Sequence, residues 1–440
     1  MAISNSHAVQ LVMALSMGIM LFCAVYALPE RVIISALILM IPFQFIDSRY
    51  GSLNMILTYI TGVALFLKRK LKVFPLMAPV FLLSLSYLLS FIQAHRMTKF
   101  DHVLYLILMG SNLVLFYMVY NFVRENENPR SVLRILTILN ILFILYCCIQ
   151  LIIGFSHFSL LGIKELSMTQ NRKDQRLVGP FTAAGITAEY FVIQIIFSGY
   201  LLLRLKEIRE KLLHVGIIAA NCAFLIATGN RGGIVSLVFG WMLFSCLYRR
   251  EMGFVRIVKI NLVMTVLFFL MSVVIILFTP FNLLFDRLSE TKIKGGVPDT
   301  RGVTWPAAWE QIVMKPLIGH GPRFRLLNEE KRKIPGREWI HYPHSLYLFI
   351  LHTLGGMGLA IYFLFAMSVF YKLMISRRCH HKDEFLNGIP NLGIIILSVF
   401  LFDQIKVEFL RYNLGDYQHY MFTLLGIFVG FADRLTSGER

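Results

Sequence analysis

The stretch INLVMTVLFFLMSVVIILFTP at residues 260–280 decides the fold class, because none of its 21 residues is charged. A helix needs about 20 mostly apolar residues to cross the hydrocarbon core of a bilayer. Of the 440 residues of the chain, 57% are hydrophobic and 15% are charged, whereas a soluble domain has about 25% charged residues. The composition excludes a soluble enzyme, a disordered protein and a coiled coil, and it predicts an all-α polytopic integral membrane protein.

Twelve further apolar runs flank this stretch and predict further helices. Run 30–46 follows Pro29 and contains Pro42, so it could be a partial or re-entrant segment instead of a full crossing. We therefore expect about twelve transmembrane helices, and no removable signal peptide, since no basic region precedes the first run. The twelve runs are at 8–28, 30–46, 51–67, 73–94, 103–123, 135–153, 183–203, 212–228, 234–248, 345–371, 389–402 and 419–432.

Four basic clusters predict the orientation of these helices. Four, two and two apolar runs separate successive clusters, so all four lie on one side, which the positive-inside rule identifies as the cytoplasm. Three crossings before residue 68 would put the amino terminus outside and two would put it inside, and we expect two. The clusters are at 68–72, 204–211, 249–259 and 372–382.

This orientation puts most of the long polar sequence on the outward side, where segment 281–344 is the largest loop. Trp305 and Trp309 lie one helical turn apart in it, which is typical of a short helix at the membrane interface. A simple aromatic belt is the other interpretation. The chain thus divides into a helical bundle over 1–280, a loop over 281–344 and C-terminal transmembrane helices over 345–440.

The charged and metal-binding residue types exclude several partners. The net charge of +18 comes from 43 Lys and Arg against 25 Asp and Glu. Basic loops hold a membrane protein at anionic lipids, and no nucleic-acid-binding motif accompanies them, so membrane lipid is expected as a partner and nucleic acid is not. The six cysteines occupy apolar or basic runs and the outward loops contain no DxD, ExD or HExxH motif, so neither a disulfide framework nor a metal cofactor is expected.

Several basic residues of the outward segments are candidates for a site that binds an anion. Arg231 lies between two apolar runs, and an ionisable side chain at membrane depth is costly and therefore suggests a function. An arginine that reaches to the outer interface is the alternative. Arg301, His320 and Arg323 surround the expected interfacial helix. His341 and His344 bracket HYPH just before the next span, where the other interpretation is ordinary solvated polar groups.

Four charged residues follow the run at 389–402 with a spacing of three. Asp403 and Lys406 form one potential ion pair, and Glu408 and Arg411 form another. Internal pairing that lets a span end near water explains them best. Glu189 could be a buried acid or lie close to the outer surface, and the sequence does not distinguish these.

The segment HSLYLFILHTLGGMG at residues 344–358 resembles the signature of the O-antigen ligase and O-antigen polymerase superfamily. That signature is a histidine followed by Asn, Ser or Gln, then nine residues and GxxG. Two further stretches resemble the family in the same order: ATGNRGG at 227–233, with an arginine at an outer helix junction, and DTRGVTWPAAWEQIVMKPLIGHGP at 299–322, with an arginine that opens the large loop.

The resemblance implies about twelve helices in the bacterial inner membrane, with the active site on the periplasmic face. It implies a metal-independent inverting glycosyltransferase that moves O-antigen polysaccharide from undecaprenyl diphosphate to lipid A-core. A repeat-unit polymerase of the same superfamily is the alternative, and a transporter or flippase is less favoured. By motif, Arg231 and Arg301 would bind the diphosphate, His344 would be the catalytic residue, and His341 matches a nearby position of the family. His341, His320 and Arg323 are possible accessory residues, the last two because of their place around the expected interfacial helix.

The chemistry of the reaction supports these roles independently. A departing diphosphate needs cationic or hydrogen-bonding groups that stabilise its growing negative charge, and guanidinium groups match its oxygens in a forked geometry. The attacking hydroxyl needs a proton acceptor, and histidine has an ordinary pKa of about 6.5. We therefore expect His344 to act as a general base.

Overall fold

Within the residues that it describes, the computed structural model is all-helical apart from two short β-hairpins, which confirms the predicted all-α class. The periplasmic position of the large loop stays a prediction. β1 (Asp47–Ser48) pairs with β2 (Gly51–Ser52), and β3 (Ile293–Lys294) pairs with β4 (Val297–Pro298), both antiparallel. The structure describes residues 16, 18–43, 47–48, 51–94, 99–125, 128–153, 176–181, 183–278, 293–294, 297–324, 342–379, 384–411 and 414–437.

The helices follow the predicted apolar runs closely, because a backbone in apolar surroundings must satisfy its own hydrogen bonds. Within the described ranges, eight helices are long and apolar enough to cross a membrane, while the number of twelve stays a prediction. The helices are α2 (Glu30–Leu39), α3 (Leu53–Leu67), α4 (Met77–Ile92), α5 (Lys99–Glu125), α6 (Pro129–Ile153), α7 (Ala184–Arg204), α8 (Ile208–Ala227), α9 (Arg231–Met252), α10 (Phe254–Phe278), α12 (Asp299–Met314), α13 (Leu346–Ser376), α14 (Glu384–Asn387), α15 (Ile389–Asp403) and α16 (Gly415–Ser437).

The run at 30–46 contains only the 10-residue helix α2, followed by a 3-10 turn over Ile41–Phe43. Ten residues of α-helix rise about 15 Å, half the thickness of the hydrocarbon core. This helix alone is therefore too short to cross a bilayer, as expected for a partial segment.

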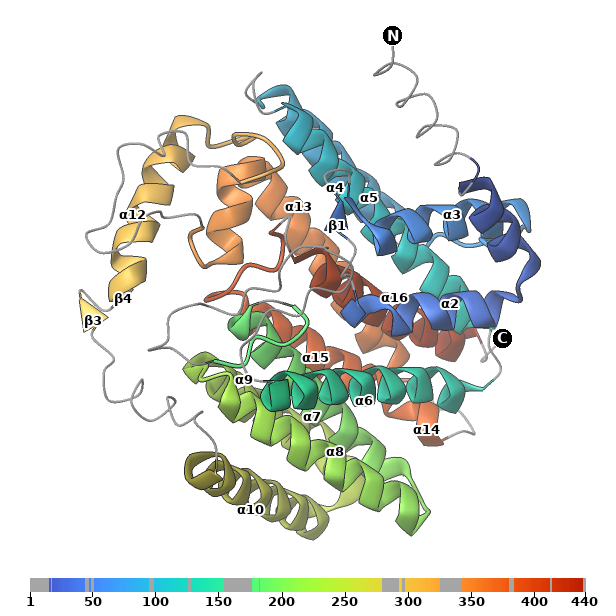
Figure 1. Ribbon diagram of the computed structural model, residues 1–440, viewed down its shortest axis with the longest axis vertical. Coiled ribbons are helices and arrows are strands. Elements are labelled where there is room, and N and C mark those ends of the chain that lie inside the picture. Colours follow the sequence, from blue (N-terminus) through green and yellow to red (C-terminus); the bar gives the residue numbers. More distant parts are fainter. Residues whose placement is uncertain are drawn as a thin grey trace.

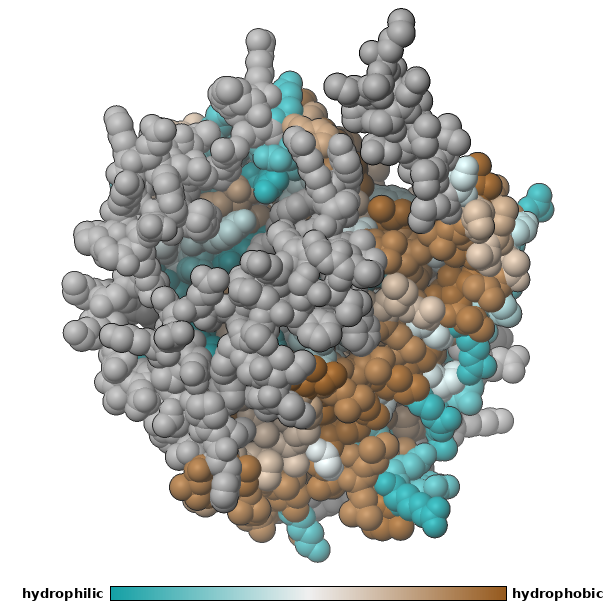
Figure 2. All heavy atoms as spheres, in the orientation of Figure 1, coloured by the Kyte–Doolittle hydropathy of each residue, from teal (hydrophilic) through white to brown (hydrophobic). Residues whose placement is uncertain are grey.

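Helices α7 and α15 form the centre of the bundle, and α10 lies at its periphery (Figure 1). In α7 almost every side chain is buried, including the polar groups of Glu189 and Gln194. In α10 large apolar side chains such as Leu262 and Phe269 are exposed. Figure 2 shows a broad hydrophobic surface on the described part of one face, with hydrophilic side chains along its edge. Such a surface suits contact with lipid.

Two of the basic clusters pair with acidic residues near the ends of α5 and α16. Lys72 pairs with Glu125 at 2.9 Å, and Lys372 pairs with Asp433 at 2.7 Å. The Tyr120 hydroxyl donates to Asp433 at 2.5 Å and so joins the ends of α5 and α16. Figure 1 shows α12 at the upper left and α14 at the lower right, on opposite sides of the bundle.

Candidate functional site

The connection between α15 and α16, residues 404–411, is the centre of the candidate site. Its backbone is tied to the start of α13, because the Leu346 amide donates to the carbonyl oxygens of Gln404 at 2.9 Å and Val407 at 3.2 Å. Gln418 on α16 donates to the Arg411 carbonyl oxygen at 2.8 Å. These bonds fix the charged side chains of the connection against the amino-terminal ends of α9, α12 and α13.

Arg231 is the first residue of α9, and its position follows from a helix cap. The Asn230 side chain accepts a hydrogen bond from the Gly233 amide at 3.2 Å, which starts the helix at Arg231. Gly232 leaves room for the Lys406 side chain, because a Cβ atom there would overlap its terminal atoms. The glycines that follow Arg231 thus allow a second cation to approach α9.

Arg301 lies in the first turn of α12 and contacts the same connection. Its Nη2 atom donates to the Lys406 carbonyl oxygen at 3.0 Å. Burial lowers the pKa of Arg301, and the nearby Arg231 lowers it further, while Glu408 and Asp403 raise it. The two arginines predicted to bind diphosphate therefore lie at one site, although 70 residues separate them in the sequence.

The two ion pairs predicted from the spacing of three are both present. Lys406 lies 2.5 Å from Asp403 and donates to the Ser236 hydroxyl at 3.1 Å. Arg411 pairs with Glu408, whose side chain is fully buried. Burial raises the pKa of Glu408 to about 7, although Arg411 opposes this shift. These acids balance part of the charge of the cations that the site brings together.

Glu189 is a buried acid, which decides between the two interpretations that the sequence left open. Its two carboxylate oxygens accept hydrogen bonds from the Gln404 amide at 3.1 and 3.0 Å. The other end of that amide accepts a hydrogen bond from the Phe409 backbone at 3.1 Å. Glu189 thus holds the connection between α15 and α16 in place through its hydrogen bonds to Gln404.

His344 lies directly before α13 in a left-handed backbone conformation, with φ of 50°. Its Nδ1 atom lies 3.0 Å from Nη2 of Arg411 and 3.8 Å from a carboxylate oxygen of Glu408. About half of its side chain, 48%, is exposed. The Trp305 indole donates to the Pro343 carbonyl oxygen at 2.8 Å and so joins α12 to the residues before His344.

The predicted accessory residues have mainly structural contacts, and His341 lies outside the described residues. His320 is buried, contacts the Gln311 carbonyl oxygen at 2.7 Å and stacks on His352. Arg323 pairs with Asp101 at 3.1 Å. Arg323 also lies near the site. Burial raises the pKa of Tyr342, whereas the positive charges of Arg411 and Arg323 both lower it, so both arginines lie close to Tyr342.

The first glycine of the GxxG motif, Gly355, has a structural role. Gly355 has φ of 71° and ψ of −172°, which interrupts α13. The adjacent Gly356 amide donates to the Pro316 carbonyl oxygen at 2.7 Å. A Cβ atom at Gly355 would overlap the Leu317 carbonyl group, and one at Gly319 would overlap that of Thr353. The loop after α12 therefore docks onto the break in α13, which fixes the position of Arg301 relative to His344.

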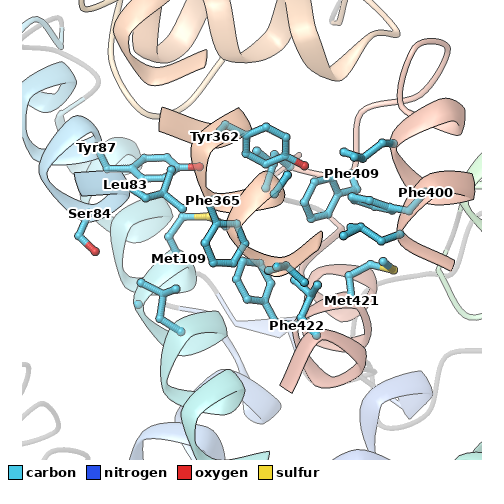
Figure 3. Close-up of a pocket in the computed structure, with 18 of the residues that line it drawn as sticks. Leu83, Ser84, Tyr87, Met109, Tyr362, Phe365, Phe400, Phe409, Met421 and Phe422 are labelled. Carbon is cyan, nitrogen blue, oxygen red and sulfur yellow. The ribbon is translucent and has the colours of Figure 1, made fainter. Parts of the chain in front are cut away.

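An apolar cavity of about 220 Å³ lies among α4, α5, α13, α15 and α16 (Figure 3). Phe409 and Leu410 line it from the same connection that carries Lys406 and Arg411. Tyr87, Phe365 and Phe400 are further lining residues and point into it. The connection thus separates a polar, cationic site from an apolar cavity.

The sequence analysis did not identify Lys406 and Arg411 as residues of this site. Their spacing in the sequence predicts only local ion pairs. The four charged residues directly after an apolar span were the feature of the sequence that indicated a functional site. In the part of the chain that the structure describes, no group of three His, Cys, Asp or Glu side chains could hold a metal ion.

Fold and site together define a polytopic helical membrane protein with a cationic site at one end of its bundle. Residues 215–363, which are 149 of the 440 residues, match the family model described as O-antigen ligase. The resemblance to the O-antigen ligase superfamily is thus confirmed for this region, which includes Arg231, Arg301, His344 and the GxxG motif. No curated protein matches the chain.

Proposed function

We propose that this protein is a metal-independent inverting glycosyltransferase of the bacterial inner membrane. It takes its glycan from undecaprenyl diphosphate at the periplasmic face and attaches O-antigen polysaccharide to lipid A-core. The observation that carries this proposal is the convergence of Arg231, Arg301 and Lys406 beside His344. Guanidinium groups can bind diphosphate oxygens through paired hydrogen bonds without a metal ion.

The reaction is a single displacement at the anomeric carbon of the donor sugar. The acceptor hydroxyl oxygen forms a bond to this carbon while the bond to the diphosphate oxygen breaks, which inverts the configuration. Negative charge grows on the departing diphosphate, and Arg231 and Arg301 stabilise it in a partly buried site. The hydroxyl proton passes to His344 or, if His344 acts as a hydrogen-bond donor, to an oxygen of the departing diphosphate.

A donor with a long isoprenoid chain also suits the arrangement around residues 404–411. Lys406 and Arg411 belong to the cationic site, whereas Phe409 and Leu410 line the apolar cavity. An amphipathic molecule can therefore place its diphosphate on one side of this connection and part of its apolar chain on the other.

The test is glycan transfer by the purified protein in detergent, with a polyprenyl-diphosphate-linked glycan and lipid A-core. We expect transfer to continue in EDTA, and we expect Arg231→Ala and Arg301→Ala to abolish it while insertion into the membrane stays normal. Lysine should restore little, because it offers a point charge instead of a fork. Lys372→Ala, at the other end of the bundle, is the control.

Near-normal transfer in either arginine variant would remove that residue from the site. Strict dependence on an added divalent metal would overturn the metal-independent mechanism. Transfer in detergent, without a gradient or a sealed membrane, would also exclude transport as the primary activity. The candidate site residues support this exclusion, because Arg231, Arg301 and His344 lie at the starts of helices instead of their centres.

A repeat-unit polymerase is the alternative within the same superfamily. Deletion of the gene separates the two activities. Loss of a ligase leaves lipid A-core without O-chains and long chains on the polyprenyl carrier. Loss of a polymerase leaves a single repeat unit on the core.

A further inference from the structure

The contact between Arg411 and His344 restricts which ring nitrogen of the histidine carries a proton. Nη2 of Arg411 lies 3.0 Å from Nδ1 of His344. A guanidinium group has only donors, so Nδ1 must accept this hydrogen bond with its lone pair. In a neutral imidazole, the proton then lies on Nε2.

Arg411 is held in this position from three sides. Its guanidinium pairs with the fully buried Glu408. It lies over the ring of Tyr342, with 4.2 Å from Cζ to the ring centre. Its carbonyl oxygen accepts from Gln418, which in turn accepts from Asn112 at 2.9 Å. A guanidinium fixed in this way keeps its donor pointed at His344.

Glu408 is too far from His344 to replace Arg411 as its partner. The distance from Nδ1 to the carboxylate oxygen is 3.8 Å, beyond hydrogen-bond range. A proton on Nδ1 would also place two donors 3.0 Å apart. The Glu408 side chain is fully buried, and its carboxylate pairs with Arg411.

We propose that the Glu408–Arg411 pair is a positioning device that holds His344 as its Nε2–H tautomer, so that His344 is a hydrogen-bond donor in the reaction. This inference rests on the proposed glycosyl transfer and revises the general-base role expected from the sequence. His344 donates from Nε2 to an oxygen of the departing diphosphate. The acceptor oxygen binds the anomeric carbon, the bond from that carbon to the diphosphate oxygen breaks, and the hydroxyl proton passes to another oxygen of the departing diphosphate.

The experiment measures the tautomer and the rate on the same purified, full-length protein. The imidazole ¹⁵N spectrum reports which nitrogen is protonated, and His344→Gln identifies the His344 signals by their loss. Arg411→Met removes the donor, Arg411→Lys keeps a donor, and Glu408→Gln releases Arg411 without removing it. Lys372→Met is the matched control, because it breaks an ion pair at the far end of the bundle.

We expect the Nε2–H tautomer in the wild type and in Lys372→Met, and a mixture with Nδ1–H in Arg411→Met. Displacement of the donor should lower kcat by about 10- to 100-fold, with little change in KM for the polyprenyl-diphosphate donor. Glu408→Gln should act in the same direction with a smaller effect, and Arg411→Lys should restore part of kcat.

A proton on Nδ1 in the wild type would overturn the inference, as would an unchanged tautomer in both Arg411→Met and Glu408→Gln. A raised donor KM with normal kcat in Arg411→Met would make Arg411 a diphosphate-binding residue instead. Absence of glycan transfer by the wild type would refute the proposed function, and the spectra would then decide the positioning role alone.

Discussion

At the scale of single residues, His344 combines a left-handed backbone with a contact to a buried ion pair. For a residue with a side chain, this conformation costs roughly 1–2 kcal/mol, and histidine is among the residues that adopt it more often. Such conformations persist where the surroundings enforce them, and they cluster at functional sites. The hydrogen bonds around Pro343 and Leu346 provide that enforcement here.

Replacement of His344 distinguishes a hydrogen-bond donor from a general base. His344→Ala should lower kcat by about 10²–10⁴-fold. His344→Gln keeps an N–H donor but is no base, so it should be clearly more active than the alanine variant. Donor binding through Arg231 and Arg301 should persist in both variants. A glutamine variant as inactive as the alanine variant, with donor binding intact, would favour the general base.

The ionisation of Glu408 should appear in the pH dependence of stability. Its pKa is raised from 4.5 to about 7 in the folded protein. The folded state therefore binds an extra proton between these values, and the free energy of unfolding should fall as pH rises from about 5 to 8, by at most about 3 kcal/mol. Thermal unfolding in detergent measures this dependence.

Glu408→Gln should remove that part of the pH dependence, because glutamine does not ionise. Glu310→Gln changes the same charge at an exposed position of α12 and should leave the slope unchanged. A slope that is equal in the wild type and Glu408→Gln would show that Glu408 ionises normally in the folded protein.

At the scale of elements, the break in α13 explains why a glycine pair follows the histidine of the motif at a fixed distance. Residues 346–354 form the helical segment between His344 and Gly355. The break at Gly355 exposes backbone groups, and the loop after α12 uses them: the Met357 amide donates to the Leu317 carbonyl oxygen at 3.2 Å. The motif thus specifies a docking geometry between two elements and places His344 at its end.

Two neighbouring glycines provide a matched test of this docking. Gly355→Ala puts a Cβ on a residue with φ of 71° and against the Leu317 carbonyl group, so it should cost more than about 1–3 kcal/mol and lower transfer strongly. At Gly356 the nearest atom to a new Cβ lies at 3.4 Å, so Gly356→Ala should be nearly neutral. Thermal unfolding and transfer assays compare them, and equal effects would contradict the docking role.

At the scale of the whole molecule, charge is divided between the two ends of the bundle. Basic clusters with their own acidic partners occupy one end, and the cationic site with its buried acids occupies the other. Apolar side chains are exposed on the helices between them. This arrangement fits a protein whose lysines and arginines at one end meet an anionic cytoplasmic leaflet.

Labelling of single cysteines should reveal this polarity. On a background without native cysteines, Glu310→Cys on α12 should react with a membrane-impermeant maleimide added from the periplasmic side. Lys206→Cys, an exposed position in a basic cluster, should react only after the inner membrane is opened. The reverse pattern would invert the proposed topology and move the active site to the cytoplasmic side.

The sequence by itself determined the helical membrane fold, the spacing of the ion pairs and the positions of Arg231, Arg301 and His344 as candidates. These features depend on local quantities: the length of an apolar run, the helical repeat and the cost of placing a charge near lipid. Glycine at 355 was recognised only as part of a motif, because its conformation depends on the loop that docks there.

Only the tertiary structure decided which of these residues meet. Arg411 reaches His344 across 67 positions, and Arg301 reaches the Lys406 carbonyl oxygen across 105. The burial of Glu189 depends in the same way on packing by distant helices. Hydrogen bonds and desolvation at such contacts are set by neighbours in space, and helical periodicity in one segment says nothing about the neighbours that another segment supplies. The proposed tautomer of His344 depends on such a tertiary contact, the one with Arg411.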